Sequence, residues 1–235
     1  MGKNLIQQAR GKGGPTYRAP SFRYKGEAKV PNKNIVGVIT DIVKCQGHSA
    51  PLLEIKYEDN SKGLMIAAEN VKVGDQIQVG IGAQVSLQNT LPLASIPEGT
   101  MVFNIESQPG DGGKFARAGG VAARVLSRSP DKVVIMLPSK KQKSFHPNCK
   151  ATIGIVAGGG RLEKPIMRAG TKFHKMKAKN KLWPIMSGSA QNAVDHPFGN
   201  KRTSRKSKAK PAPHNAPPGR NVGMIRPRRT GRKNK

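Results

Sequence analysis

The positive charge of this chain is concentrated at its two ends, which confines a folded core to the middle. Residues 1–30 hold 7 Lys+Arg and 1 acid, and residues 161–235 hold 21 and 2. Residues 31–160 hold 14 and 10 and are nearly neutral. Because charged, Pro/Gly-rich segments bury too little apolar surface to offset the entropy of ordering, we expect two basic extended arms. Residues 1–30 and 170–235 should be disordered in the free protein and ordered on a partner.

The charge also indicates the class of partner. A formal net charge of +29 over 235 residues would make a free globule repel itself, so a polyanion is the expected partner. No stretch approaches the roughly 20 apolar residues of a membrane span, so no membrane partner is expected. The N-terminus lacks the apolar region of a signal peptide, and two cysteines make no disulfide framework. We therefore expect a cytoplasmic protein.

Short apolar runs between turn residues predict β-structure in the middle. Residues 35–39, 52–57, 64–68 and 76–79 form four such runs, each with the length and β-branched content of a strand. Strands this short and closely spaced suit a small closed barrel such as an OB-fold, to which we assign residues 31–90.

A second group of runs follows Pro97-Glu98-Gly99. Residues 101–105, 121–126, 133–137 and 152–156 predict four more strands. They suit a second small barrel of SH3-like size.

The expected organisation is all-β with little helix, because no long window has helical periodicity. It consists of an arm (1–30), an OB-fold barrel (31–90), an SH3-like barrel (91–160) and a C-terminal arm (161–235). Residues 91–97, which contain two prolines, fit a linker between the barrels.

Residues 110–115 form a glycine-rich segment with a lysine, which is similar in composition to a phosphate-binding loop. Gln108 stands where that motif has its first glycine, and Phe115 replaces the Ser/Thr that would hold magnesium. We interpret the segment as a flexible connection.

Four residues have the spacing of zinc half-sites. Cys45 and His48 form a C-x₂-H pair, and His146 and Cys149 form an H-x₂-C pair. No sequence rule brings the two pairs together, and buried cysteines with surface histidines are the ordinary explanation. We expect neither a metal nor another cofactor.

Ser187, Ser189, Asp195 and His196 lie close together in the sequence and raise the question of nucleophilic catalysis. The segment lacks a Gly-x-Ser-x-Gly elbow, and Pro197 after the histidine suits a fixed loop equally well. We expect a positional role for His196 and no catalytic residue.

Trp183 stands in an apolar island of the basic C-terminal arm, after Lys179 and Lys181. It could stack on a nucleic-acid base or anchor a hinge within the protein.

Three functions remain open on these grounds. The first is a structural RNA-binding protein acting through many phosphates. The second is an enzyme centred on His196 with Ser189 or Asp195. The third is a free single-strand binder, which is disfavoured because Tyr57 is the only aromatic residue in 31–90.

Seven short motifs of the chain are distinctive when taken together. They are Leu-Pro-Leu at 91–93, Ile-Pro-Glu-Gly-Thr at 96–100, Val-Phe-Asn-Ile-Glu at 102–106, Pro-Gly-Asp-Gly-Gly at 109–113, Cys-Lys-Ala-Thr-Ile-Gly at 149–154, Asn-Lys-Leu-Trp-Pro at 180–184 and Asn-Ala-Val-Asp-His-Pro at 192–197. With these motifs the chain resembles the universal large-subunit ribosomal protein two family in its archaeal form, and the resemblance runs from about residue 10 to about residue 205. The chain departs from the family pattern at 187–192 and at 199–201, so RNA contacts there should differ in detail.

The resemblance implies a non-enzymatic structural constituent of the large ribosomal subunit. It implies an OB-fold followed by an SH3-like barrel, with basic extensions threaded through large-subunit ribosomal RNA near the peptidyl-transferase region. It also implies support of subunit association and tRNA positioning, neighbouring ribosomal proteins as partners, an intersubunit bridge to the small subunit, and no homo-oligomer.

We expect the ribosomal RNA contacts to come mainly from basic side chains of the arms and the glycine-rich loops. The residues are Arg10, Lys12, Arg18, Arg23, Lys114, Arg117, Arg161, Arg168, Lys172, Lys175, Lys177, Lys179, Lys181, Trp183, Asn192, Asp195, His196, Lys201, Arg202 and Arg205.

Overall fold

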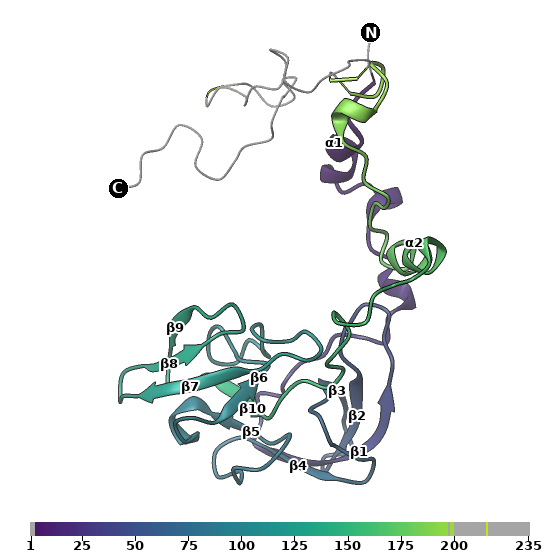
Figure 1. Ribbon diagram of the computed structural model, residues 1–235. Helices are drawn as coiled ribbons and strands as arrows, with labels where there is room; N and C mark the ends of the chain where they lie inside the picture. Colours follow the sequence, from purple (N-terminus) through teal and green to yellow (C-terminus); the bar gives the residue numbers. More distant parts are fainter. Residues whose placement is uncertain (1–2, 197, 200–214, 216–235) are drawn as a thin grey trace. The chain divides into compact units, whose positions relative to one another are not determined.

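The computed structural model describes residues 3–196, 198–199 and 215 (Figure 1). The chain divides into two compact units. Ser21–Met167 form one, here called the β body, and Met1–Pro20 together with Arg168–Lys235 form the other, here called the arm unit. Among the described residues, no helix is long and apolar enough to cross a membrane.

The β body is built on one ten-stranded sheet in the order β3-β2-β1-β4-β5-β10-β6-β7-β8-β9. The strands are β1 (Ile35–Val43), β2 (Leu52–Tyr57), β3 (Lys62–Ile66), β4 (Gln76–Val79), β5 (Thr90–Pro92), β6 (Met101–Phe103), β7 (Ala123–Arg128), β8 (Val133–Met136), β9 (Gln142–Phe145) and β10 (Lys150–Ile153). The strand pairs are antiparallel except for β4 and β5, which meet in parallel at Val79 and Thr90. This parallel contact joins the two groups of strands into one sheet (Figure 1).

The predicted all-β class is confirmed, and each of the eight predicted strands overlaps an observed one. Two strands were missed. β5 is only three residues long and ends in proline. β9 reads Gln-Lys-Ser-Phe, and its first three residues are exposed, so it has no apolar alternation to detect.

Residues 91–97, expected as a linker, contribute three side chains to the core. Leu91, Leu93 and Ile96 are each at most 2% exposed and belong to the hydrophobic cluster of β5–β10. The prolines suggested a linker, but they lie in a segment that places Leu91, Leu93 and Ile96 in the core.

Three apolar clusters hold the β body together. Ile39 and Ile55 belong to the cluster of β1–β4, and Val125 belongs to that of β5–β10. The third cluster combines Leu52 of β2 with Phe103 of β6. Since fully burying one such side chain contributes about 1.5–3 kcal/mol, this shared cluster stabilises the two strand groups as one body.

Tyr57 at the end of β2 is buried, and its hydroxyl has no hydrogen-bond partner among the described residues. Burial, with a smaller contribution from nearby Asp59, raises the pKa of Tyr57 to about 12. The folded state therefore disfavours the phenolate form of Tyr57. The contribution of Tyr57 protonation to the free energy of unfolding is fully present below the unfolded pKa of about 10, and it is lost as the pH rises from there towards 12.

We expect Tyr57→Phe to raise the free energy of unfolding by about 1 kcal/mol at pH 7, because an unsatisfied buried hydroxyl is removed. The variant should also lose less stability than the wild type between pH 9 and pH 11. Urea unfolding of the full chain at these pH values measures both effects. If the free energy of unfolding fell equally with pH in the wild type and in Tyr57→Phe, this account of Tyr57 would be contradicted.

The described residues of the arm unit include two short helices, α1 (Ile6–Gly11) and α2 (Ala169–Lys177), neither of which was predicted. Short 3₁₀ turns lie at η1 (Pro15–Tyr17) and η4 (Gly188–Ala190) in the arm unit, and at η2 (Ser21–Arg23) and η3 (Leu93–Ser95) in the β body. No large side chain of the arm unit is buried among the described residues. Disorder of the arms in the free protein stays a prediction.

Candidate nucleic-acid interface

Asn180 joins the two segments of the arm unit. It follows α2 with a φ of 50°, the left-handed conformation that often ends helices and that asparagine tolerates well. Its side-chain Nδ2 donates to the carbonyls of Thr16 (2.8 Å) and Arg18 (2.7 Å). Its own carbonyl accepts a hydrogen bond from the guanidinium of Arg10. The residues predicted from the sequence did not include Asn180. The signal that could have found it is an asparagine directly after the lysine-rich segment 172–179, a position where helices often end.

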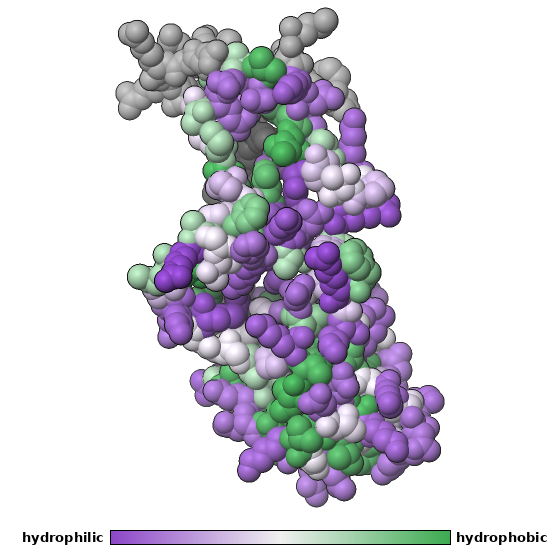
Figure 2. Space-filling model, turned by 90° about the vertical axis from the view of Figure 1, so that its right-hand side faces the viewer, coloured by the Kyte–Doolittle hydropathy of each residue, from purple (hydrophilic) through white to green (hydrophobic). Residues whose placement is uncertain are grey.

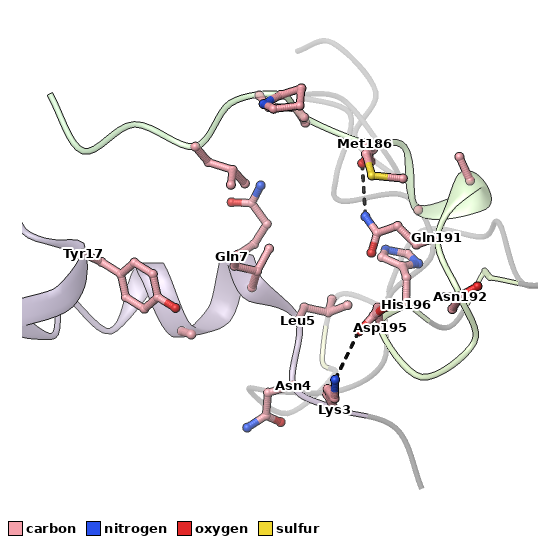
Figure 3. A pocket seen from close by; sticks show the side chains of 17 residues that line it. Lys3, Asn4, Leu5, Gln7, Tyr17, Met186, Gln191, Asn192, Asp195 and His196 are labelled. Carbon is pink, nitrogen blue, oxygen red and sulfur yellow. Dashed lines mark hydrogen bonds and ion pairs between the residues drawn. The ribbon is translucent and has the colours of Figure 1, made fainter. Parts of the chain in front are cut away.

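A second junction lies near the start of the chain. The Lys3 amide donates to the Val194 carbonyl (2.8 Å), and Lys3 Nζ lies 3.8 Å from Asp195 Oδ1 (Figure 3). Because both side chains are largely exposed, this ion pair contributes little stability. The ion pair gives the Asp195 carboxylate Lys3 as its partner instead of His196.

His196 is held by its surroundings on several sides. Its Nδ1 accepts the Phe198 amide (3.1 Å), and its own amide donates to the Asn192 carbonyl (3.1 Å). The ring packs against Gly188, where a Cβ would lie 2.4–2.6 Å from three ring atoms. Any larger residue at 188 would displace the His196 ring. With Nδ1 accepting, the neutral ring carries its proton on Nε2 and can donate from that atom.

The nucleophile–base pair of the enzymatic hypothesis is not formed. Within the described part of the chain, no hydrogen bond joins His196 to Ser187 or Ser189, and Asp195 pairs with Lys3. The geometry thus provides neither an activated serine nor an acid that orients the histidine.

The predicted basic residues of the arm unit lie mostly at its surface. Lys12, Arg18, Arg168, Lys175, Lys177 and Lys181 are exposed, while Arg10, Lys172 and Lys179 are partly buried. Hydrophilic side chains cover much of both units on the face in Figure 2.

Two of the partly buried cations lie over aromatic rings. The Arg10 guanidinium is 5.1 Å from the centre of the Tyr17 ring. Lys172 Nζ is 5.4 Å from the centre of the Trp183 ring. Cation–π attraction fixes these side chains, so Trp183 already has a partner within the protein.

Predicted residues of the β body are partly engaged by the body itself. Arg117 donates to the carbonyls of Gly113 (2.9 Å) and Ala28 (2.6 Å), and burial lowers its pKa. Arg161 donates to the Gly119 carbonyl (3.2 Å). Lys114 Nζ lies 3.8 Å from Asp111, and the Arg23 guanidinium lies over the exposed Phe22 ring. Lys201, Arg202 and Arg205 lie outside the described residues.

The glycine-rich loop is held in place by the protein's own carboxylates. Glu106 accepts the amides of Gly110 and Gly112, each at 3.2 Å. Asp111 accepts the Gly113 amide at 3.1 Å. The N–H groups that would cradle a phosphate in a nucleotide-binding loop are therefore occupied, and the loop is a hydrogen-bonded structure rather than a loose connection.

The two candidate zinc half-sites lie in different parts of the core. Cys45 packs in the cluster with Leu52 and Phe103, and Cys149 packs in the cluster of β5–β10. Among the described residues, no group of three or more His, Cys, Asp or Glu side chains is placed to hold a metal ion. Burial raises the pKa of the Cys149 thiol, which disfavours the thiolate that zinc requires.

Comparison with known proteins gives a consistent result. The family model described as Ribosomal Proteins L2, C-terminal domain, matches residues 86–216. The chain is similar over its full length to proteins named large ribosomal subunit protein uL2. It is 51% identical to that of Halorubrum lacusprofundi and 50% identical to that of Haloarcula marismortui, over 99% of this chain and 98% of each relative. It is 50% identical to that of Archaeoglobus fulgidus, over 98% of this chain and 99% of the relative.

Proposed function

The chain belongs to the uL2 family of large ribosomal subunit proteins, in its archaeal form, and from this premise we propose that it binds large-subunit ribosomal RNA near the peptidyl-transferase region. The family is structural and non-enzymatic, and its members are components of cytoplasmic ribosomes. Support of subunit association, an intersubunit bridge and tRNA positioning belong to the proposal.

One observation carries the proposal: the arm unit exposes a strongly basic surface and has no buried apolar side chain of its own among the described residues. Neutralising phosphates with Lys and Arg releases counterions from RNA. We therefore expect the arm segments to become ordered as they bind folded RNA.

In this proposal the β body and the arm unit have different roles in RNA binding. The barrels, which we assign to residues 31–90 and 91–160, form a rigid docking body with a continuous sheet and a shared core. The arms carry most of the charge neutralisation through the residues named above. Arg117 and Arg161 act chiefly by ordering the loops of the body, since their guanidinium groups already donate to carbonyls.

The direct test is co-sedimentation with large ribosomal subunits after a wash in high salt. The native protein should remain with the large subunit, because many phosphate contacts and a docked body must be released together. Quantitative release of the protein into the supernatant, with the other core proteins retained, would contradict the proposal.

His196 should position RNA or a loop rather than perform chemistry. We expect His196→Gln, which keeps a donor and an acceptor but cannot act as a base, to leave peptide-bond formation largely intact. His196→Ala should chiefly impair assembly or subunit joining, because the Phe198 amide loses its acceptor. The measurement is the single-turnover rate of peptide-bond formation in purified, fully assembled particles. A loss of about 100-fold with the Gln variant, the lower end of general acid–base catalysis, would revive the enzymatic hypothesis.

A further inference from the structure

The arm unit contains a pocket of about 800 Å³ that its two segments line together. One wall comes from α1 with the residues around it, and the other from residues 182–196 (Figure 3). The apolar part of the lining comprises Leu5, Ile6, Tyr17, Leu182, Ile185 and Met186. A concave, mostly apolar site with a few polar groups is the usual form of a ligand pocket.

The apolar walls are not covered by the protein itself. Ile6 is 46% exposed, Ile185 70% and Met186 58%. Grouped exposure of large apolar side chains marks an interaction site rather than a random surface. Here it occurs in a unit with no buried apolar side chain among its described residues, so an occupant of the pocket would bury apolar surface that the arm unit cannot bury alone.

The polar part of the lining presents side-chain amides. Asn4, Gln7 and Asn192 line the pocket, and within the described residues their amide groups make no hydrogen bond. Each offers both a donor and an acceptor. Paired donor and acceptor groups are what the edge of a nucleobase requires.

The charge of the two arm segments determines the sign of charge that an occupant should carry. Residues 1–20 hold four Lys+Arg and no acid, and residues 168–199 hold six and one acid. That one acid, Asp195, is paired with Lys3 at the pocket. An occupant should therefore combine a flat apolar part with negative charge, which describes a nucleotide of RNA.

We propose, on the basis of the RNA binding proposed above, that this pocket receives one unpaired nucleobase of large-subunit ribosomal RNA, extruded from its strand. The base lies between the wall of Leu5 and Ile6 and the wall of Ile185 and Met186, with its polar edge towards a side-chain amide of the lining such as that of Gln7. Its phosphates lie against lysines and arginines of the two arm segments. Single-stranded RNA is commonly read in this way, by splaying out a base and burying its face.

The test compares large ribosomal subunits carrying the full-length wild type, Met186→Ser, Ile6→Ser or Val194→Ser. Val194→Ser is the matched control, because Val194 is an exposed apolar residue of the same arm that does not line the pocket. Dimethyl sulfate and a carbodiimide together report the accessibility of the Watson–Crick edges of all four bases. Hydroxyl-radical cleavage reports the RNA backbone.

One unpaired base should be protected in the wild type and in Val194→Ser. Its reactivity should rise about 5-fold or more in both pocket variants, in line with the loss of one base-stacking contact, while the backbone protection stays. Base reactivities that are the same in all four particles, with the backbone protected, would overturn the pocket proposal and leave RNA binding standing. Release of a neighbouring protein by the pocket variants without a change at a base would show that the occupant is a protein. Absence of any backbone protection by the wild type would instead remove the proposed function.

Discussion

Deleting residues 201–235 should strongly flatten the salt dependence of ribosomal RNA binding. This segment holds 13 Lys+Arg and no acid. If the full chain neutralises about 8 phosphates, log K should fall against log[salt] with a slope of roughly −6 to −7. A truncated chain that keeps about half of these contacts should give a slope near −3, and its affinity at low salt should fall by orders of magnitude. Filter binding or fluorescence titration over a series of salt concentrations measures the slope.

A second variant separates charge from chain length. It keeps all 235 residues and replaces the 13 Lys+Arg of 201–235 by Gln. If counterion release carries the effect, this variant should behave like the truncation. A wild-type slope near −2 would show that the arms contribute little, and a wild-type slope for the Gln-substituted chain would show that the charge of this segment is not what binds.

The fold was predictable where side-chain burial imposes a pattern on the sequence. β1 and β2 alternate between buried and exposed positions or carry β-branched runs, so their existence could be predicted from the residues. β5 and β9 could not be predicted, because one is three residues long and the other is mostly exposed. The two groups of strands are joined by the parallel contact of Val79 with Thr90 and by the isolated bridge between Ala68 and Val156. No local sequence pattern encodes either contact.

The positive charge of the candidate interface could be predicted from the sequence, but the hydrogen bonds that its residues make within the protein could not. Arg117 donates to Ala28, 89 residues away in the sequence, and Asn180 donates to Thr16, 164 residues away. Such contacts depend on the assembled tertiary structure. Sequence reasoning therefore predicted an RNA contact for Arg117, whose guanidinium binds carbonyls of the β body. It did not predict Asn180, which joins the two segments of the arm unit.

Glu106 is a buried charged side chain at the centre of a hydrogen-bond network in the β body. It is 0% exposed. Its carboxylate accepts three backbone amides: Gly110 and Gly112 at 3.2 Å and Lys150 at 2.8 Å. Lys150 Nζ in turn donates to the carbonyls of Pro31 and Asn32, both at 3.1 Å. One carboxylate thus fixes the glycine-rich loop against β10 and, through Lys150, orders the chain before β1.

We expect Glu106→Ala to lower the free energy of unfolding of the full chain by about 3–5 kcal/mol, because three buried amides lose their acceptor at once. Glu106→Gln keeps the shape and one acceptor oxygen, so it should cost about 1–2 kcal/mol and should still fold if the Ala variant does not. Glu98→Ala is the matched control. Glu98 is an exposed carboxylate that accepts one backbone amide, from Arg128 at 2.7 Å, and its loss should cost less than 1 kcal/mol by the usual weakness of exposed interactions. In urea unfolding, the loss of unfolding free energy should be largest for Glu106→Ala, smaller for Glu106→Gln and smallest for Glu98→Ala. If Glu106→Ala cost no more than Glu98→Ala, the loop would be held by its glycine backbone alone, and the buried carboxylate would have no structural role.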